Sequence, residues 1–220
     1  MTLALYGHPF SSYTWKALIP LYACEIPFTF HMLDETTTDT DAWRFVTTRA
    51  GPLGKFPVLA DGAAVIFEAT SIIEHLVVHQ PRATGLIPAD ADAAVQTRML
   101  DRVFDNYVMN VVQGMIGEYI FKDAPDPAAC RRIRDNLERT YDWLERWLAG
   151  RPAPGRAITL VECAAAPSLF YADWVHEITA RWPRLKAWRA HLNALPAVAR
   201  CIDEARPWRP NFPLGAPDRD

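Results

Sequence analysis

Apolar residues along the first eighty positions recur with two different periods. Short runs and every-second-residue patterns predict strands, whereas spacings of three and four, as for Ile72 with Leu76, predict helices. An Asp61-Gly62 pair between two apolar runs predicts a β-hairpin. The expected strands are 2–6, 27–33, 56–59 and 64–67, and the expected helices are 14–23, 41–48 and 70–79. This order predicts a compact α/β unit that closes near Gln80-Pro81.

The pattern after Pro88 is helical throughout. The predicted helices cover 90–121, 126–149, 159–174, 183–195 and 196–205. Asp126 is followed by a proline, as at a helix start, and Thr159 with Glu162 forms a capping box. The tail from Pro207 carries four prolines, which predicts an extended segment. We therefore expect an α/β domain over 1–82 and an all-helical domain over 88–220.

Composition excludes several classes of protein. Half of the 220 residues are hydrophobic and 22% are charged, which is typical of a globular chain rather than a disordered one. The formal net charge is −3, so we expect no broad basic surface for nucleic acid or an anionic membrane. The longest uncharged run, Met1 to Trp15, is too short to cross a bilayer and does not resemble a signal peptide. These features predict a soluble, cytoplasmic protein.

The four cysteines, Cys24, Cys130, Cys163 and Cys201, are far apart in the sequence. No CxxC pair and no Cys/His cluster has the spacing of metal ligands, so we expect no metal site. Buried free thiols are the favoured state, although the sequence alone leaves a disulfide open.

The Phe56-Pro57 pair begins an apolar strand, where proline cannot donate a ladder hydrogen bond. One interpretation is an edge strand with a trans bond, which is far commoner. The other is a cis-proline turn that exposes the main chain of Val58, so that an extended peptide could pair with it as an added strand. The local pattern leaves both open.

A second candidate is the strand-to-helix junction at Glu68-Ala69-Thr70-Ser71. The first amides of a helix are unpaired and lie at its positive end, so an anion can bind there. Glu68 beside them could hold an ammonium group, and together they would bind an α-amino acid head group. The alternative is that Thr70 or Ser71 only caps the helix and Glu68 is solvated.

The third candidate is Ser11-Ser12, at the expected start of the first helix. A hydroxyl there can donate to a thiolate, and the helix dipole favours the same negative charge. Lowering a thiol pKa from about 8.5 to about 6.5 requires roughly 2.7 kcal/mol, which one charge-assisted hydrogen bond and a helix end can supply. The alternative is a plain N-cap serine.

The chain resembles the glutathione S-transferase family in these places and in its helical half. The matching segments are Leu5 to Lys16, Gly51 to Leu59, Glu68 to Leu76, and the capping box at Thr159 followed by Pro167 and the Trp188 helix. The Ser-Ser-x-x-Trp opening is closest to the zeta-type pattern. Each motif alone is weak, whereas all four in order with the family's spacing are specific.

The resemblance implies a thioredoxin-like N-terminal domain, an all-helical C-terminal domain and a homodimer. Glutathione would be the co-substrate, and Ser11 or its neighbour Ser12 would activate its thiol. The Pro57 bond would be cis, Val58 would pair with the cysteinyl main chain, and the helix start would hold the γ-glutamyl group. The substrate-binding residues so implied are Lys55, Phe56, Pro57, Val58, Glu68, Ala69 and Thr70.

Four positions depart from the family pattern. Ala69 replaces the serine whose hydroxyl and amide both bind the γ-glutamyl carboxylate, so only the amide remains. Gly51 replaces an asparagine, and Glu162 replaces the aspartate of the capping box. Tyr13 stands where zeta-type members have cysteine, which argues against assigning their isomerase activity directly.

An electrophile site is expected between the two domains. The candidate lining, which recurs at helical spacing, is Tyr107, Val111, Met115 and Tyr119. Such a stripe is more often core or dimer interface. Trp208 and Phe212 in the tail are further candidates.

The expected function is conjugation of glutathione to small hydrophobic electrophiles. Isomerase, dehalogenase or peroxidase activity would use the same thiolate. The rival prediction is a non-catalytic binding or interaction protein with weakened glutathione affinity, and Ala69 favours it. The Ser11-Ser12 pair favours the enzyme, because a binding scaffold has no need of a hydroxyl at that helix start.

Overall fold

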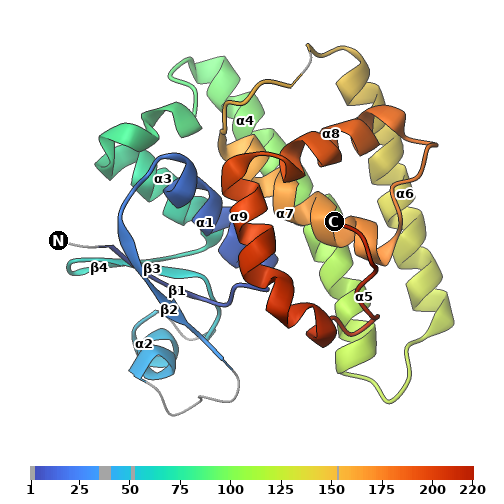
Figure 1. The fold of residues 1–220 in the computed structure, drawn as a ribbon, viewed down its shortest axis with the longest axis horizontal. Helices are drawn as coiled ribbons and strands as arrows, with labels where there is room; N and C mark the ends of the chain where they lie inside the picture. The colour runs from blue at the N-terminus through green and yellow to red at the C-terminus, as the bar shows by residue number, and fades with distance from the viewer. Residues whose placement is uncertain (1–2, 35–40, 51–52, 153) are drawn as a thin grey trace.

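The computed structural model describes residues 3–34, 41–50, 53–152 and 154–220, which form an α/β part and a helical part side by side (Figure 1). Within these residues the strands are β1 (Leu3–Gly7), β2 (Phe28–Met32), β3 (Val58–Asp61) and β4 (Ala64–Phe67). They make one sheet in the order β2-β1-β3-β4. β1 pairs with β2 in parallel and with β3 antiparallel, and β3 forms the predicted hairpin with β4. The predicted fold class, an α/β domain followed by an all-helical domain, is confirmed.

The helices that cover the sheet are α1 (Ser12–Ala23), α2 (Asp41–Arg49) and α3 (Ala69–His79). Leu5 and Leu59 lie opposite each other and point into the main core, to which α1 and α3 contribute. Their neighbours Tyr6 and Val58 point to the other face, where α2 packs. The two-residue period of a strand thus places α2 on the opposite face from α1 and α3.

The helical part comprises η2 (Pro81–Leu86), α4 (Ala91–Val103), η3 (Phe104–Met109), α5 (Asn110–Ile120), α6 (Pro127–Ala149), α7 (Leu160–Val175), α8 (Pro183–Asn193), α9 (Pro196–Ala205) and η4 (Arg206–Asn211). α7 is its central element and is buried along nearly its whole length. It contacts α1 of the α/β part as well as α4, η3 and α8. Among the described helices, none combines the length and the apolar character needed to cross a membrane.

The helix starts predicted from the sequence are confirmed. Ser11 is the N-cap of α1, and its side-chain oxygen accepts a hydrogen bond from the Thr14 amide at 3.3 Å. Asp126 caps α6 in the same way. Thr159 and Glu162 form the capping box of α7, so glutamate serves there in place of aspartate.

Two predictions about the helical part need correction. The expected helix over 90–121 is interrupted by η3, a π-helical stretch in which hydrogen bonds span five residues. The tail does not stay extended: it forms η4, a 3-10 helix, and then folds back over the helical part (Figure 1). Pro207 near the start of η4 is compatible with that helix, because the amide that proline lacks would be unpaired there anyway.

The four cysteines are free thiols, as the sequence favoured. Cys130, Cys163 and Cys201 are buried, and Cys24 is half-buried. Burial raises the pKa of the Cys163 and Cys201 thiols well above its usual value. These two side chains are therefore packing groups rather than nucleophiles.

A buried lysine joins the two parts of the structure. Lys16 of α1 is 1% exposed, and its Nζ lies 2.6 Å from a carboxylate oxygen of Asp101 on α4 and 2.6 Å from one of Asp105 on η3. Nζ also donates to the Thr70 hydroxyl of α3 at 2.9 Å, and that hydroxyl donates to Asp101 at 3.0 Å. Arg102 places a second cation 3.2 Å from Asp101. The starts of α1 and α3 are thus fixed against the helical part.

The charge of Asp105 depends on this lysine. Burial raises the pKa of Asp105 above its ordinary value of 3.8, while Lys16 opposes the shift. When a carboxyl has a higher pKa in the folded state than in the unfolded state, its protonation stabilises the fold. That contribution is complete below the unfolded-state pKa and is lost as the pH rises through the folded-state pKa. At neutral pH the folded state therefore relies on Lys16 to offset the buried negative charge.

We expect Lys16→Met to destabilise the protein by about 3–5 kcal/mol near neutral pH, because it leaves buried carboxylates without their cation. The loss should shrink as the pH falls toward the raised pKa of Asp105, since protonation removes the uncompensated charge. Urea unfolding at one protein concentration, repeated across pH, measures both effects.

Arg44→Met is the matched control, because it breaks an exposed ion pair with Asp41. It should cost less than about 1 kcal/mol, with little dependence on pH. Equal losses in the two variants would contradict the role given to Lys16.

Candidate active site

The loop between β1 and α1 accepts hydrogen bonds from side chains of both parts of the structure. The Trp15 indole donates to the Pro9 carbonyl at 2.6 Å. The Tyr171 hydroxyl of α7 donates to the Phe10 carbonyl at 2.7 Å. Burial raises the pKa of Tyr171 well above its usual value, so this hydroxyl keeps the proton that it donates. The bonds fix the loop immediately before Ser11.

Ser11 and Ser12 both line a cleft of about 910 Å³ between the two parts. Ser11 is half-buried and accepts a hydrogen bond from the Thr14 amide, so its own hydroxyl proton remains to be donated. Ser12 is the first residue of α1 and is buried. Of the two hydroxyls, the more exposed Ser11 is the better placed to donate into the cleft.

The peptide bond between Phe56 and Pro57 is cis, as the family resemblance implied. Phe56 is half-buried and lines the cleft, whereas Lys55 before it is exposed. Val58 lies between strand neighbours on both sides and is fully buried, so its main chain belongs to the sheet. The ligand contact that the resemblance implied for the Val58 main chain would therefore compete with the sheet, whereas Phe56 lines the cleft. Gly51 lies outside the described residues.

The start of α3 has no side-chain cap. Glu68 occupies the N-cap position, but its carboxylate makes no capping bond and is exposed. Its φ of 68° lies in the left-handed region that glutamate rarely adopts, a kind of strain that is common at ligand sites. Ala69 is buried, and Thr70 commits its hydroxyl to Lys16 and Asp101 rather than to the helix end. An anion here would therefore meet main-chain amides.

Negative charge gathers beside this helix end. Burial, together with the carboxylates of Asp105 and Glu68, raises the pKa of Tyr13 to about 12. Tyr13 therefore stays protonated at neutral pH. Because Asp105 is already paired with Lys16, Glu68 is the carboxylate beside this helix end that can face the cation of a ligand. The α3 amides next to Glu68 match the two charges of an α-amino acid. Sequence reasoning missed Asp105, because only the fold brings it here from the helical part.

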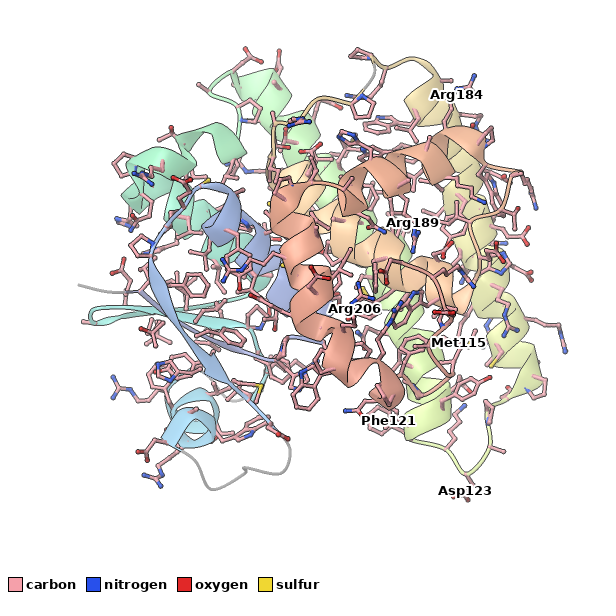
Figure 2. The ribbon with its side chains drawn as sticks, viewed as in Figure 1. Met115, Phe121, Asp123, Arg184, Arg189 and Arg206 are labelled. Carbon is pink, nitrogen blue, oxygen red and sulfur yellow. The ribbon has the colours of Figure 1, made fainter. Side chains whose placement is uncertain are left out.

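The remaining wall of the cleft is largely apolar. On the helical side the wall is formed by side chains from the last residue of η3, from α5 and from the residue after α5. These are Met109, Val112, Gln113, Ile116, Ile120 and Phe121. The tail supplies Trp208, Asn211, Phe212 and Pro213. Trp208 and Phe212 thus line the cleft, as the sequence analysis considered. Phe121 is 84% exposed, and Figure 2 shows it beyond the end of α5.

The stripe predicted from helical spacing lies elsewhere. Tyr107 and Val111 line a separate cavity of about 430 Å³ against α6. Met115, labelled in Figure 2, is fully buried in the core. Tyr119 is exposed and is not among the cleft-lining residues. The predicted stripe advances by four residues at each step and so drifts by about 40° around the helix each time, whereas the observed lining combines steps of three and four.

His8 is a candidate that sequence reasoning missed. Its Nδ1 accepts a hydrogen bond from the Phe10 amide at 3.1 Å, so the neutral ring carries its hydrogen on Nε2. The ring meets Trp208 edge-on at a centroid distance of 4.6 Å, and both residues line the cleft. The Gly7-His8-Pro9 run predicts a turn, but no local pattern predicts a contact with the tail.

Two family models match this chain, one in each part of the fold. The model described as "Glutathione S-transferase, N-terminal domain" matches residues 5–83, and the corresponding C-terminal domain model matches residues 127–191. The chain belongs to the glutathione S-transferase family. The first matched range contains Ser11, Phe56 and Glu68, and the second contains the capping box of α7.

Relatives in sequence span nearly the whole of this glutathione S-transferase. It is 27% identical over 214 residues to the "Probable maleylacetoacetate isomerase" of Vibrio cholerae, and this alignment covers 94% of this chain and 98% of the relative. It is 24% identical over 213 residues to a glutathione S-transferase of Silene vulgaris, which covers 92% of this chain and 97% of the relative.

Solved structures show the same fold. Ure2p in complex with glutathione superposes with a TM-score of 0.79 at 21% identity, over 92% of this chain and 93% of that one. The glutathione transferase URE2P8 from Phanerochaete chrysosporium, solved with oxidized glutathione, gives a TM-score of 0.81 at 16% identity, over 94% and 96% of the two chains. At these identities the likeness shows the fold alone.

We expect Gly7→Ala to destabilise this transferase by about 1–3 kcal/mol through overpacking. A Cβ at Gly7 would lie 2.6 Å from Thr14 Oγ1, and Thr14 is buried and β-branched, so it cannot turn away easily. Denaturant unfolding measures the loss. Gly85→Ala is the control, because a Cβ there meets nothing within 4 Å, and it should change stability by no more than about 0.5 kcal/mol. A Gly7 variant as stable as the control would show that the loop is not held as described.

Proposed function

We propose that this glutathione S-transferase binds glutathione along the cleft and activates its thiol for attack on small hydrophobic electrophiles. The observation that carries the proposal is that Ser11 and Phe56, from distant motifs, line one cleft. Tyr13, next to Ser12, lies close enough to Asp105 and Glu68 for their charges to add to burial in raising its pKa. Relatives named glutathione S-transferase support the same chemistry.

Glutathione would lie across the α/β part. Its γ-glutamyl carboxylate would meet the first amides of α3, and its ammonium group would lie near Glu68. Its cysteinyl main chain would pair with Phe56 before the cis bond, with Lys55 nearby as a surface cation. This arrangement carries the thiol toward the start of α1.

Ser11 would stabilise the thiolate by donating its hydroxyl proton to the sulfur. The positive end of α1 acts in the same direction, because its dipole favours negative charge there. The thiol proton leaves to solvent, and the thiolate attacks the electrophilic carbon to form a carbon–sulfur bond. In the same step a leaving group departs with its electron pair, or the pair of an activated double bond moves to the next atom, which then takes a proton from solvent. The apolar wall excludes water from the reacting atoms. Ser12, which is buried, would help to shape the helix start.

The cleft favours neutral electrophiles. The ionisable residues of the described lining are His8, Asp34 and Tyr171, and neither lysine nor arginine is among them. Maleylacetoacetate, the substrate in the name of the Vibrio cholerae relative, carries carboxylates that would require a cation. The aromatic lining instead fits a flat, uncharged substrate. We therefore place conjugation ahead of that isomerisation for this chain.

We also propose a homodimer in the cytoplasm. Exposed apolar side chains gather on β4, α3 and α4, namely Phe67, Val78, Val95 and Met99. The Arg98–Glu74 ion pair places part of α3 next to α4, and we propose that a second copy covers these exposed apolar side chains. Four free thiols suit a reducing compartment.

A non-catalytic binding protein is the second candidate function. Ala69 removes a hydroxyl from the proposed γ-glutamyl site, which weakens the case for catalysis. The nitrogen regulation fragment of the yeast prion protein Ure2p also shares this fold, with a TM-score of 0.80 at 22% identity. Retention on immobilised glutathione, followed by turnover of a neutral aromatic electrophile, distinguishes the two functions. Binding without turnover would favour the second.

Ser11→Ala should lower turnover at neutral pH by about 10- to 100-fold, the loss of one hydrogen bond to a charged acceptor of roughly 1.5–3 kcal/mol. The pKa of the bound thiol should rise at the same time, which ultraviolet absorbance of the thiolate detects. Because Ser11 also caps α1, the variant loses about 0.5–2 kcal/mol of stability, so turnover is measured well below its melting temperature.

Two further variants isolate the hydroxyl. Ser11→Gly should lose as much activity as Ser11→Ala, although glycine is a tolerated N-cap. Ser12→Ala should keep most of the activity. A large loss in Ser12→Ala with little in the Ser11 variants would reverse the assignment, and no loss in any of them would refute the mechanism.

Ala69→Ser should tighten glutathione binding about 10-fold, because the added hydroxyl supplies one charge-assisted hydrogen bond to the γ-glutamyl carboxylate. Serine is well tolerated at a helix start, so stability should hardly change. Titration calorimetry on both proteins gives the affinities. Unchanged affinity would mean that Ser71 already supplies the donor, since Thr70 is committed to Lys16 and Asp101. Lost affinity would favour the binding-protein function.

A further inference from the structure

The end of the tail is anchored to the central helix of the helical part. The tail turns back after η4 and ends over α7 (Figure 1). Arg219 Nε donates to the Asp173 carboxylate at 2.8 Å, and its Nη2 donates to the Asp173 carbonyl at 2.8 Å. Asp173 is buried near the end of α7 and also accepts from the Ile178 amide. The buried Asp173 carboxylate therefore accepts hydrogen bonds both from the tail and from the segment after α7.

Asp220 accepts hydrogen bonds from three arginines. Its carboxylate accepts from Arg206 at 3.0 Å and from Arg209 at 2.7 Å. Its main-chain oxygen accepts from Arg189 Nη1 at 2.8 Å, and Arg189 on α8 is itself buried (Figure 2). Arg209 also donates to the Arg219 carbonyl at 2.8 Å. Two of these arginines belong to η4, so the end of the tail is tied back to the tail's own first turn.

η4 presents two different faces because of its 3-10 geometry. With three residues per turn, Arg206 and Arg209 share one face, and Trp208 and Asn211 share another. The arginine face meets Asp220, whereas Trp208 and Asn211 line the cleft. Contacts with Asp220 therefore orient the residues that bound the electrophile site.

We propose that Arg219 and Asp220 form a tail latch that positions the electrophile-binding wall. That wall, called the tail wall here, consists of Trp208, Asn211, Phe212 and Pro213. The latch residues do not line the cleft, so they are positioning residues and not catalytic ones. The latch bonds to η4, α7 and α8 and not to the starts of α1 and α3, so loosening it should weaken binding of the electrophile and leave glutathione unaffected.

Asp220→Asn tests the latch by removing its charge at constant shape. In hydrogen-exchange mass spectrometry, segment 206–214 should exchange about 3- to 10-fold faster, the effect expected when half-exposed ion pairs are lost. The KM for a neutral aromatic electrophile should rise by a similar factor, about 3- to 10-fold, while the KM for glutathione changes less than about twofold. Raising the salt concentration should loosen segment 206–214 in the unmodified protein and have little further effect on the variant.

Asp203→Asn is the matched control. Asp203 pairs with the same Arg206 at 3.2 Å but does not contact the end of the tail. It should leave both the exchange of segment 206–214 and the electrophile KM unchanged. Arg219→Gln provides a second disruption, and it should reproduce the effect of Asp220→Asn, because Arg219 is the latch residue bonded to Asp173.

The kinetic measurement rests on the proposed function, whereas the exchange measurement does not. Unchanged exchange of segment 206–214 in both latch variants would overturn the proposal, whatever the activity. Faster exchange with an unchanged electrophile KM would overturn the positioning role while leaving the proposed catalysis intact. An unmodified protein without glutathione-dependent turnover would refute the proposed function, and the exchange data would still decide the latch.

Discussion

The ion pairs of Lys16 with Asp101 and Asp105 fix how the two parts of this transferase meet. Removing a lysine and two carboxylates from water is costly, and the cost is offset only because each charge has a close partner. Thr70 completes the group, so the start of α3 is bonded to the same ammonium as the first turns of α1. The distance between the two helix starts is thereby set from inside the protein. A ligand that contacts both helix starts would therefore bind across a fixed distance.

The two helix starts are similar in charge but complete their hydrogen bonds differently. At α1 the Ser11 oxygen satisfies an amide and still has a proton to donate, which suits a group that becomes negative during a reaction. At α3 no side chain caps the helix, which suits a ligand that is already an anion. Asp105 pairs with Lys16 at the contact between the two parts, and its charge adds to burial in raising the pKa of Tyr13. The interdomain contact and the electrostatics of the site are therefore one system.

Local sequence signals predicted the fold class and several helix starts, because each signal rests on neighbouring residues. The capping box at Thr159 and the Ser11 cap are of this kind. The cis bond before Pro57 came from the family resemblance, since the local pattern left cis and trans open. The electrophile side depends on distant contacts and was predicted poorly. The observed lining of α5 keeps α-helical spacing, but which face of that helix meets the cleft is set by packing and not by the spacing itself. The tail folds back through ion pairs between residues far apart in sequence, such as Arg219 with Asp173, which its proline content does not reveal.

The two sides of the cleft therefore differ in how easily they can change. The thiol side is anchored by a buried cation and by buried donors such as Trp15, so a change there disturbs the whole interdomain contact. The tail wall is held largely by half-exposed pairs of Asp220, each of which contributes up to about 1 kcal/mol. Breaking a buried pair costs about 3–5 kcal/mol, so substitutions are tolerated far more readily at the tail than at Lys16. Variation among members of one fold is then expected at the electrophile wall, where specificity can change while the thiol chemistry is retained.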